Sequence, residues 1–369
     1  MSRLADWHMF PDIAEALIRA PLSWPSNLQH FAIHQLIIFS LRAVEVRQLK
    51  AVSRWLVLTG NTVDKAKTKV ISREEGYHGV TLAAMSATGL SPYWPLFEPR
   101  VPGFSHIPSP YPYRYEGRDH QSQGLSAADE LEQAILREGA ETIAMFIAEP
   151  VQGAGGVIVP QDDYFPRIRE ICDHYKVLLV ADEVITGFGR LGDPFAAQHF
   201  NVEPDLITCA KGLTSGTVPM GAVIVKKEIY DAFQQGDQKV IDLFHGYTYS
   251  AHPLASAAMI AALDVYVNDG LFDHANTLSQ YWEEMCHSLN GTDHIIDIRN
   301  SGLVAGIEMS PRDEKPGARG YDIFTDAFHN YNLLIRITGD TIALSPPLIA
   351  EKEHIDIIIE TLRTIIPNH

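Results

Sequence analysis

The sequence predicts an α/β protein in two unequal parts: a large domain built on a mostly parallel sheet flanked by helices, and a smaller C-terminal α+β domain. From about Thr142, short fully apolar runs alternate with amphipathic helical stretches, a pattern typical of parallel strands covered on both faces. After Pro253 helical stretches dominate and enclose only short strands. The 369 residues, 46% of them hydrophobic, suffice for one large core or two unequal ones.

Apolar runs and helical periodicity give the elements in chain order. The large domain is predicted to contain a strand over Ile143–Ala148, a helix over Tyr164–Tyr175, and strands over Val177–Ala181, Leu206–Cys209 and Ala222–Val225. The small domain is predicted to contain helices over Leu254–Val267, Leu278–Leu289, Tyr321–Tyr331 and Lys352–Ile365, and strands near Gly302–Met309, Leu334–Ile337 and Ile342–Ser345. The stretch Pro95–Tyr115, rich in Pro, Tyr and Gly, is interpreted as a long ordered loop.

Composition excludes several classes of function. The chain carries 29 Lys and Arg against 46 Asp and Glu, a formal net charge of -17, which disfavours binding to nucleic acid or to an anionic membrane surface. The three cysteines are far apart and show no spacing of a zinc site or a disulfide framework, so we expect no metal and a cytoplasmic location. No stretch is predicted to span a membrane or to act as an export signal.

Polar residues follow three of the predicted strands. The first strand runs into Glu149 and then a glycine-rich segment, Gly153–Gly156; the second ends in Asp182; the third is followed by Lys211. In open α/β sheets the carboxyl ends of the strands face the ligand crevice. A lysine amine that condenses with an aldehyde, next to a carboxylate that keeps a ring nitrogen protonated, is what a cofactor bound as a Schiff base requires.

Each of these signals also has a simpler interpretation. A lysine after a strand is most often a solvated surface charge, and the pair Asp182 and Glu183 is often only a helix N-cap followed by an acidic first turn. The segment Gly153–Gly156 lacks the GxGxxG spacing of a dinucleotide site, which favours a tight turn over a phosphate loop. Taken one at a time, the signals leave these alternatives open.

Taken together, four strings resemble one family. They are FIAEPVQGAGGVIVP from Phe146, LLVADEVITGFGRLG from Leu178, DLITCAKGL from Asp205 and HGYTYSAHPLA from His245. They resemble the subgroup III (class III) aminotransferases, which are pyridoxal 5'-phosphate enzymes of fold type I, and the resemblance extends from about Leu58 to the C-terminus. The strings PGARGYDIF and RITGDTIALSPPLI resemble most closely the omega-amino acid:pyruvate, or beta-alanine:pyruvate, aminotransferases.

The resemblance implies roles for the cofactor-binding residues. Lys211 would form the Schiff base and then move a proton between substrate and cofactor, and Asp182 would pair with the pyridine nitrogen. Val184 would pack on one face of the ring. Tyr77, followed by His78 in the string YHG, would stack on the other face.

The resemblance also implies more distant roles. Glu149 would support the polar network at the strand ends, and Arg336 would bind a substrate carboxylate as a bidentate fork. Thr248 would reach the cofactor phosphate of a neighbouring subunit, which implies a homodimer with a shared active site, possibly assembled further into a tetramer. The substrates would be a small amino donor and a keto acid.

The implied reaction moves an amino group from an omega-amino acid or amine to pyruvate by a ping-pong Schiff-base mechanism. Another activity of the same subgroup, with a different donor or as an aminomutase, would share the lysine and the aspartate. A folded but catalytically silent homologue is a third possibility. The visible colour of a Schiff-base cofactor would separate this third possibility from the two enzymes.

The N-terminal region departs from the family pattern. Only 76 residues precede Tyr77, and the family's Ser-Gly-Ser-Glu-like phosphate turn has its nearest counterpart in Ser40–Glu45, where Leu41 and Arg42 replace small residues. We therefore expect weaker cofactor binding than in full-length relatives. The expected division is an atypical region over residues 1–54, a large cofactor-binding domain over 55–252 and a small domain over 253–369.

Overall fold

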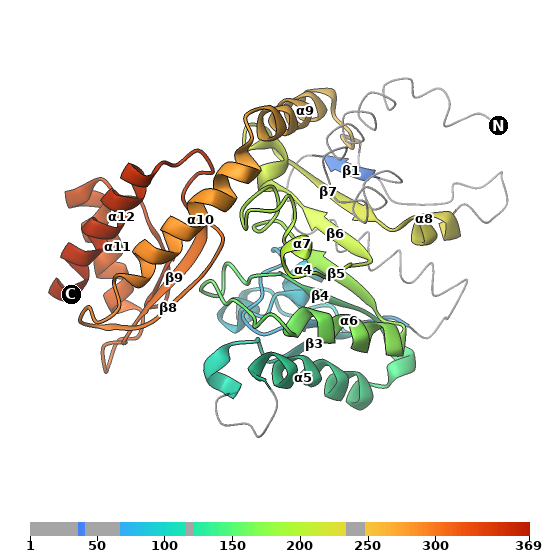
Figure 1. The fold of residues 1–369 in the computed structure, drawn as a ribbon. Coiled ribbons are helices and arrows are strands. Elements are labelled where there is room, and N and C mark those ends of the chain that lie inside the picture. Colours follow the sequence, from blue (N-terminus) through green and yellow to red (C-terminus); the bar gives the residue numbers. More distant parts are fainter. Residues whose placement is uncertain (1–35, 41–66, 116–121, 234–247) are drawn as a thin grey trace.

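The computed structural model describes residues 36–40, 67–115, 122–233 and 248–369, in which two β-sheets carry the fold (Figure 1). The larger sheet has seven strands and is mostly parallel, with helices on both faces; the smaller, C-terminal sheet is antiparallel and packs against helices. The predicted α/β class, with a second, smaller α+β part, is therefore confirmed. Of the predicted phosphate turn Ser40–Glu45, only Ser40 is described, as the last residue of a strand; residues 41–45 lie outside the described residues.

The large sheet has the order β1-β7-β6-β5-β4-β2-β3. Neighbours from β3 through β6 pair in parallel, whereas β7 is antiparallel to both of its neighbours. The link from β6 to β7 is too short for a parallel crossover, which needs a dozen or more residues, so the chain returns in the opposite direction. The strands are β1 (Leu36–Ser40), β2 (Lys69–Arg73), β3 (Phe104–Ile107), β4 (Ile143–Ala148), β5 (Leu178–Asp182), β6 (Leu206–Cys209) and β7 (Met220–Val225).

Strand β4 shows why the central strands are apolar throughout. All six of its residues are buried. Phe146 and Ala148 pack into the cluster formed with α5 (Gln123–Glu138) and α6 (Tyr164–Tyr175), while Met145 and Ile147 belong to a second cluster on the other face. The sequence of a strand that is covered on both faces is a continuous apolar run, as predicted for this segment.

The stretch Pro95–Tyr115 is not only a loop, and the prediction was wrong in this respect. It contains β3, which pairs in parallel with β2 at the edge of the sheet. Strand β3 has the sequence FSHI, too short and too polar to be recognised by apolar alternation. Its pairing with β2 makes it a strand. Strand β2 and helix α5 were likewise not predicted.

The C-terminal sheet has the order β10-β11-β9-β8 and packs against three helices that share one apolar cluster with it. Strand β8 was not predicted, and α10 begins seven residues before the expected Leu278. The elements are α10 (Leu271–His287), β8 (Ile295–Ser301), β9 (Val304–Met309), α11 (Ala318–Tyr331), β10 (Arg336–Thr338), β11 (Thr341–Leu344) and α12 (Lys352–Ile365). The domain boundaries stay a prediction.

Helix α9 (Pro253–Asn268) joins the two parts and packs against the end of β6 and the turn after it. Among the described helices, none alone is long and apolar enough to cross a membrane; α9 and α10 meet that test only as a pair bent by 60°. The remaining short helices are α4 (Leu82–Ala87), α7 (Ala196–His199), α8 (Lys227–Phe233) and the 3-10 turns η2 (Ser91–Leu96), η3 (Pro112–Tyr115), η4 (Ala140–Thr142), η5 (Lys211–Thr214) and η6 (Ile366–Asn368).

Candidate functional site

The carboxyl ends of three neighbouring parallel strands form one edge of the large sheet. Strands β4, β5 and β6 are adjacent and run in the same direction. Glu149 follows β4, Asp182 ends β5, and Lys211 stands two residues after β6. The structure therefore brings the three predicted strand-end residues to the same edge, where α/β folds place their ligand crevice.

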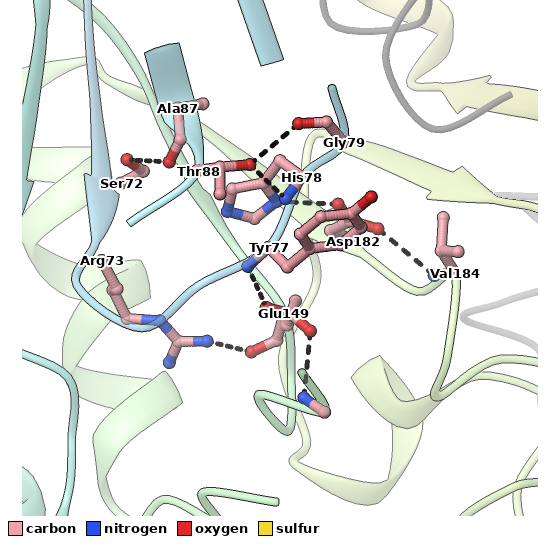
Figure 2. A network of polar contacts seen from close by, with 11 residues as sticks. Ser72, Arg73, Tyr77, His78, Gly79, Ala87, Thr88, Glu149, Asp182 and Val184 are labelled. Atoms are coloured by element: carbon pink, nitrogen blue, oxygen red, sulfur yellow. Dashed lines mark hydrogen bonds and ion pairs between the residues drawn. The ribbon is translucent and has the colours of Figure 1, made fainter. Parts of the chain in front are cut away.

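Asp182 is buried and hydrogen-bonded to His78 (Figure 2). The Nδ1 atom of His78 lies 2.8 Å from Oδ2 of Asp182, and both side chains are almost fully excluded from solvent. The backbone N–H of Val184 donates to Oδ1 at 3.3 Å. Because the carboxylate accepts, Nδ1 of His78 carries the proton. Nε2 of His78 is buried without a hydrogen-bond partner among the described residues.

Glu149 ties the segment of Tyr77 and His78 to the end of β4. Its Oε1 accepts the backbone N–H of Tyr77 at 2.8 Å, and its Oε2 accepts that of Gly153 at 3.0 Å (Figure 2). Burial raises the pKa of this carboxyl, and nearby His78 opposes the shift. The two N–H donors fix the loop that carries Tyr77 against the glycine-rich segment.

Glu183, and not Asp182, caps a helix. Its two carboxylate oxygens accept the backbone N–H groups of Ala196 and Ala197, at the start of α7, at 2.8 and 2.7 Å, and the hydroxyl of Thr186 at 2.8 Å. The interpretation of the acidic pair as the start of a local helix is wrong, because a turn and not a helix follows Asp182 and Glu183; Glu183 caps α7, which begins at Ala196. Burial raises the pKa of Glu183 to about 7, despite these donors.

This raised pKa predicts a pH-dependent stability. The folded chain binds the Glu183 proton more tightly than the unfolded chain, so the stability contributed by this carboxyl falls as pH rises from about 4.5 to about 7. Glu183→Gln removes that dependence. Between pH 5 and pH 8, the free energy of unfolding of the native chain should fall by on the order of 2 to 3 kcal/mol relative to that of the Glu183→Gln variant.

Denaturant titrations at several pH values measure this difference. Glu228→Gln, which changes an exposed carboxylate on α8, serves as the matched control. A stability difference that stays constant across the pH range would show that burial does not perturb Glu183.

Lys211 opens η5 with a left-handed backbone, φ 39°. A non-glycine residue in this region carries strain, of a kind that clusters at functional sites. Tyr266 of α9 holds this turn in place. Its hydroxyl donates to the carbonyl of Gly212 at 2.7 Å, and its ring stacks on that of Phe188, with 6.0 Å between the ring centroids. A Cβ at Gly212 would approach Phe188 to 2.8 Å, so the residue after the lysine must be small.

The remaining predicted residues lie outside this network. Thr248 is exposed in the turn that precedes α9. Arg336 is exposed at the start of β10. The segment Gly153–Gly156 forms a tight turn, with the N–H of Gly156 bonded to the carbonyl of Gly153 at 3.2 Å and a bridge between Gln152 and Ile158. The tight-turn interpretation of this segment is confirmed.

Sequence reasoning missed two residues that support the site. The buried guanidinium of Arg73 donates from Nη2 to the backbone carbonyl of Glu149, and lies 5.7 Å from the centre of the Tyr164 ring. The hydroxyl of Thr88 accepts the N–H of His78 at 2.9 Å and donates to the carbonyl of Gly79 at 3.1 Å. No spacing in the sequence connects these residues, because each acts through a backbone group of another segment.

Comparison with known proteins places the chain in a family. The family model described as aminotransferase class-III matches residues 42–366. The chain belongs to the class-III aminotransferases. This confirms the resemblance that the sequence strings indicated, and with it the enzyme class and the fold. Pyridoxal phosphate is the cofactor of this family, so the predicted cofactor is confirmed as well.

Several class-III aminotransferases are similar over most of the chain. An omega-aminotransferase of Caulobacter vibrioides is 48% identical over 302 residues, which cover 81% of this chain and 69% of that protein. A beta-alanine–pyruvate aminotransferase of Pseudomonas aeruginosa is 40% identical over 300 residues, covering 80% and 66%. A mitochondrial gamma-aminobutyrate transaminase of rice is 39% identical, covering 79% and 58%. The match thus spans about two thirds, or less, of these curated relatives.

The structural comparison agrees. An omega transaminase of Pseudomonas jessenii, solved in complex with PMP, superposes with a TM-score of 0.85 at 30% identity, covering 97% of this chain and 86% of that chain. The described site also fits the family's cofactor chemically. It offers a buried carboxylate on Asp182 for a ring nitrogen, a lysine at the next strand end, and a buried Nε2 on His78 that has no hydrogen-bond partner in the described part of the chain.

Proposed function

We propose that this chain transfers an amino group from an omega-amino acid or an amine to pyruvate in two alternating half-reactions. The observation that carries the proposal is the strand-end arrangement: buried Asp182 bonded to His78, with Lys211 at the end of the neighbouring strand. The names of the Caulobacter and Pseudomonas relatives support the choice of donor and acceptor.

Asp182 and His78 would act on the cofactor ring. When bound, pyridoxal phosphate supplies an electron sink for the substrate carbon that loses its proton. The carboxylate of Asp182 would hold a proton on the ring nitrogen. His78 donates its Nδ1–H to Oδ2 of Asp182 and thereby fixes the orientation of the carboxylate.

Lys211 and its neighbours would attach and orient the cofactor. The Nζ of Lys211 would bind it covalently and then move the substrate proton. Tyr77 and Val184 would hold the two faces of the ring, and Glu149 fixes the backbone of Tyr77. The αL backbone of Lys211, supported by Tyr266, sets the direction in which its side chain leaves the strand end.

Arg336 would bind the substrate carboxylate, and its removal should separate two classes of substrate. Arg336→Ala is expected to raise the KM for pyruvate and for amino acids roughly 10- to 100-fold, the scale of a lost charge-assisted hydrogen-bond pair. An amine donor without a carboxylate should be little affected in its own half-reaction. Single-turnover kinetics of the two half-reactions measure this difference.

The matched control is Arg363→Ala, which removes a surface ion pair with Glu360 on α12. It should leave both half-reactions unchanged. Equal losses for the two substrate classes in Arg336→Ala would mean that Arg336 has a structural role.

We propose that the working form is a homodimer in which Thr248 of a second copy completes the phosphate site. Thr248 is exposed in the single chain. The segment over residues 80–101 exposes five large apolar side chains, which supports a partner that covers this segment: Val80, Leu82, Tyr93, Leu96 and Val101. The molar mass of the purified protein in solution tests this proposal.

The direct test of the function is reconstitution with pyridoxal phosphate followed by assay of alanine formed from pyruvate. Beta-alanine, gamma-aminobutyrate and a simple aromatic amine are compared as donors. Alanine formation with beta-alanine or the amine supports the proposal. Transfer from gamma-aminobutyrate alone would favour the activity named for the rice relative. A colourless protein that forms no alanine would mean a silent homologue.

A further inference from the structure

The tight turn after β4 donates a hydrogen bond to Glu149 at the end of β4 and accepts hydrogen bonds from residues of the small sheet. We call residues 153–156 the glycine turn. On the side of the large sheet, Glu149 accepts the N–H of Gly153 at 3.0 Å, and the side-chain amide of Gln152 donates to the carbonyl of Glu74 at 2.9 Å. The glycine turn is thus fixed to the strand end whose carboxylate also holds the backbone of Tyr77.

On the side of the small sheet, Arg299 of β8 supplies most of the contacts. Its guanidinium donates to the carbonyl of Gly156 at 2.6 Å and to that of Val157 at 2.9 Å. Asp297 and Glu308 hold the same guanidinium at 2.6 Å each. These charge-assisted bonds are enough to fix the small sheet to the glycine turn.

Thr338 adds one further hydrogen bond at a different place. Its hydroxyl donates to the carbonyl of Ala154 at 2.9 Å. Thr338 is the last residue of β10, a strand of three residues at the edge of its sheet that pairs only with β11 among the described strands. Pairing with β11 and packing of Ile337 on the apolar cluster hold β10 to its own sheet, whereas the bond from Thr338 joins β10 to the glycine turn.

The turn that follows β10 is held from the other side. Asp340 accepts the backbone N–H groups of Gly317 and Gly320, at the start of α11, at 2.6 and 2.9 Å. The carboxyl end of β10 is therefore clamped between α11 and the glycine turn, and the contact with the glycine turn is made by Thr338.

Arg336 and Thr338 share one face of β10. Residues two apart in a strand point to the same side of the sheet. The face that meets the glycine turn through Thr338 is therefore the face that carries Arg336. The glycine turn comes shortly after Glu149 in the chain. Glu149 lies at the same edge of the large sheet as Asp182 and Lys211.

We propose that Thr338 is a positioning residue for Arg336: its bond to Ala154 holds the edge strand so that the guanidinium faces the crevice at the strand ends. This inference rests on the proposed function of Arg336 as the carboxylate-binding residue. In this role Thr338 would act through Arg336 and not by binding the substrate or the cofactor itself. Because Arg299 fixes the sheet independently, losing the hydroxyl should disturb β10 without unfolding the chain.

The test replaces Thr338 by valine, which keeps the shape and removes the hydroxyl. The KM for pyruvate should rise roughly fivefold, the scale of one neutral hydrogen bond, while the rate with an amine donor lacking a carboxylate changes less than about twofold. Thr338→Ser should restore the native KM. Thr325→Val, which removes an exposed hydroxyl bonded to Tyr321 on α11, is the matched control and should change neither value.

A second readout does not depend on turnover. Hydrogen exchange of the peptide that covers residues 333–344 should accelerate in Thr338→Val and stay native in Thr338→Ser, because the edge strand loses an anchor. The peptide of β9 should exchange as in the native chain. Unchanged exchange at 333–344 would overturn the proposal, and so would acceleration spread over both peptides.

The double variant Arg336→Ala with Thr338→Val separates the two proposals. If Thr338 acts through Arg336, the valine should add nothing to the pyruvate KM of Arg336→Ala. A selective effect of Arg336→Ala with none from Thr338→Val would overturn the role of Thr338 alone. An Arg336→Ala variant without substrate selectivity would overturn the function of Arg336 and the role of Thr338 together.

Discussion

Replacing Lys211 by alanine is expected to abolish the covalent attachment of pyridoxal phosphate and to reduce turnover by many orders of magnitude. Lys211 is the lysine that the described structure places at the carboxyl end of β6, beside β5 and Asp182. Loss of its amine removes both the attachment point and the group that moves the substrate proton. Reduction with borohydride followed by peptide mapping measures the attachment directly.

The matched control for this experiment is Lys226→Ala. Lys226 also follows a strand, β7, but β7 runs antiparallel to β6, so Lys226 lies at the opposite edge of the sheet. There it pairs with Glu203 and Asp205. Its replacement should leave the cofactor attached at Lys211. An adduct trapped at another lysine in the native chain would refute the assignment.

Asp182→Asn is expected to lower kcat by orders of magnitude while the fold stays intact. Asparagine keeps the shape of the side chain but removes the charge that would stabilise a protonated ring nitrogen, and such a buried electrostatic contact is worth several kcal/mol of barrier. The amide oxygen can still accept the Nδ1–H of His78. In the native chain, this Nδ1 lies 2.8 Å from the carboxylate oxygen of Asp182. Steady-state kinetics and a thermal melt together measure the two effects.

Glu183→Gln is the control at the adjacent position. The carboxylate of Glu183 caps α7 through Ala196 and Ala197, so its loss should alter stability much more than turnover. The two neighbouring acids are thus expected to give opposite patterns. A mild effect of Asp182→Asn on kcat would contradict the assignment of Asp182 to the ring nitrogen.

Part of the fold was predictable because it depends on local pattern. Strand β4 is apolar in all six residues since both of its faces are covered, and α6 was predicted with its observed bounds. Strand β3 could not be predicted in this way, because its four residues become a strand only by pairing with β2. Strand β8 was missed likewise, since its polar residues Asp297, Arg299 and Asn300 interrupt the apolar pattern.

The sequence by itself determined which chemical groups stand at the strand ends. In a parallel α/β sheet every strand delivers its carboxyl end to the same edge, so Glu149, Asp182 and Lys211 could be placed together from the order of strands alone. The family strings then added Tyr77 and His78. The sequence likewise determined the tight turn that follows Glu149, since its glycines lack the spacing of a phosphate loop.

Only the tertiary structure decided how these groups are supported. His78 meets Asp182 across 104 residues of sequence, and Thr338 meets Ala154 across 184. The structure also decided that Glu183, and not Asp182, caps a helix. Hydrogen bonds of this kind depend on distance and direction between segments that fold together, and a buried donor or acceptor must find a partner wherever the fold places one. Those distances and directions cannot be predicted from residue type and spacing along the chain.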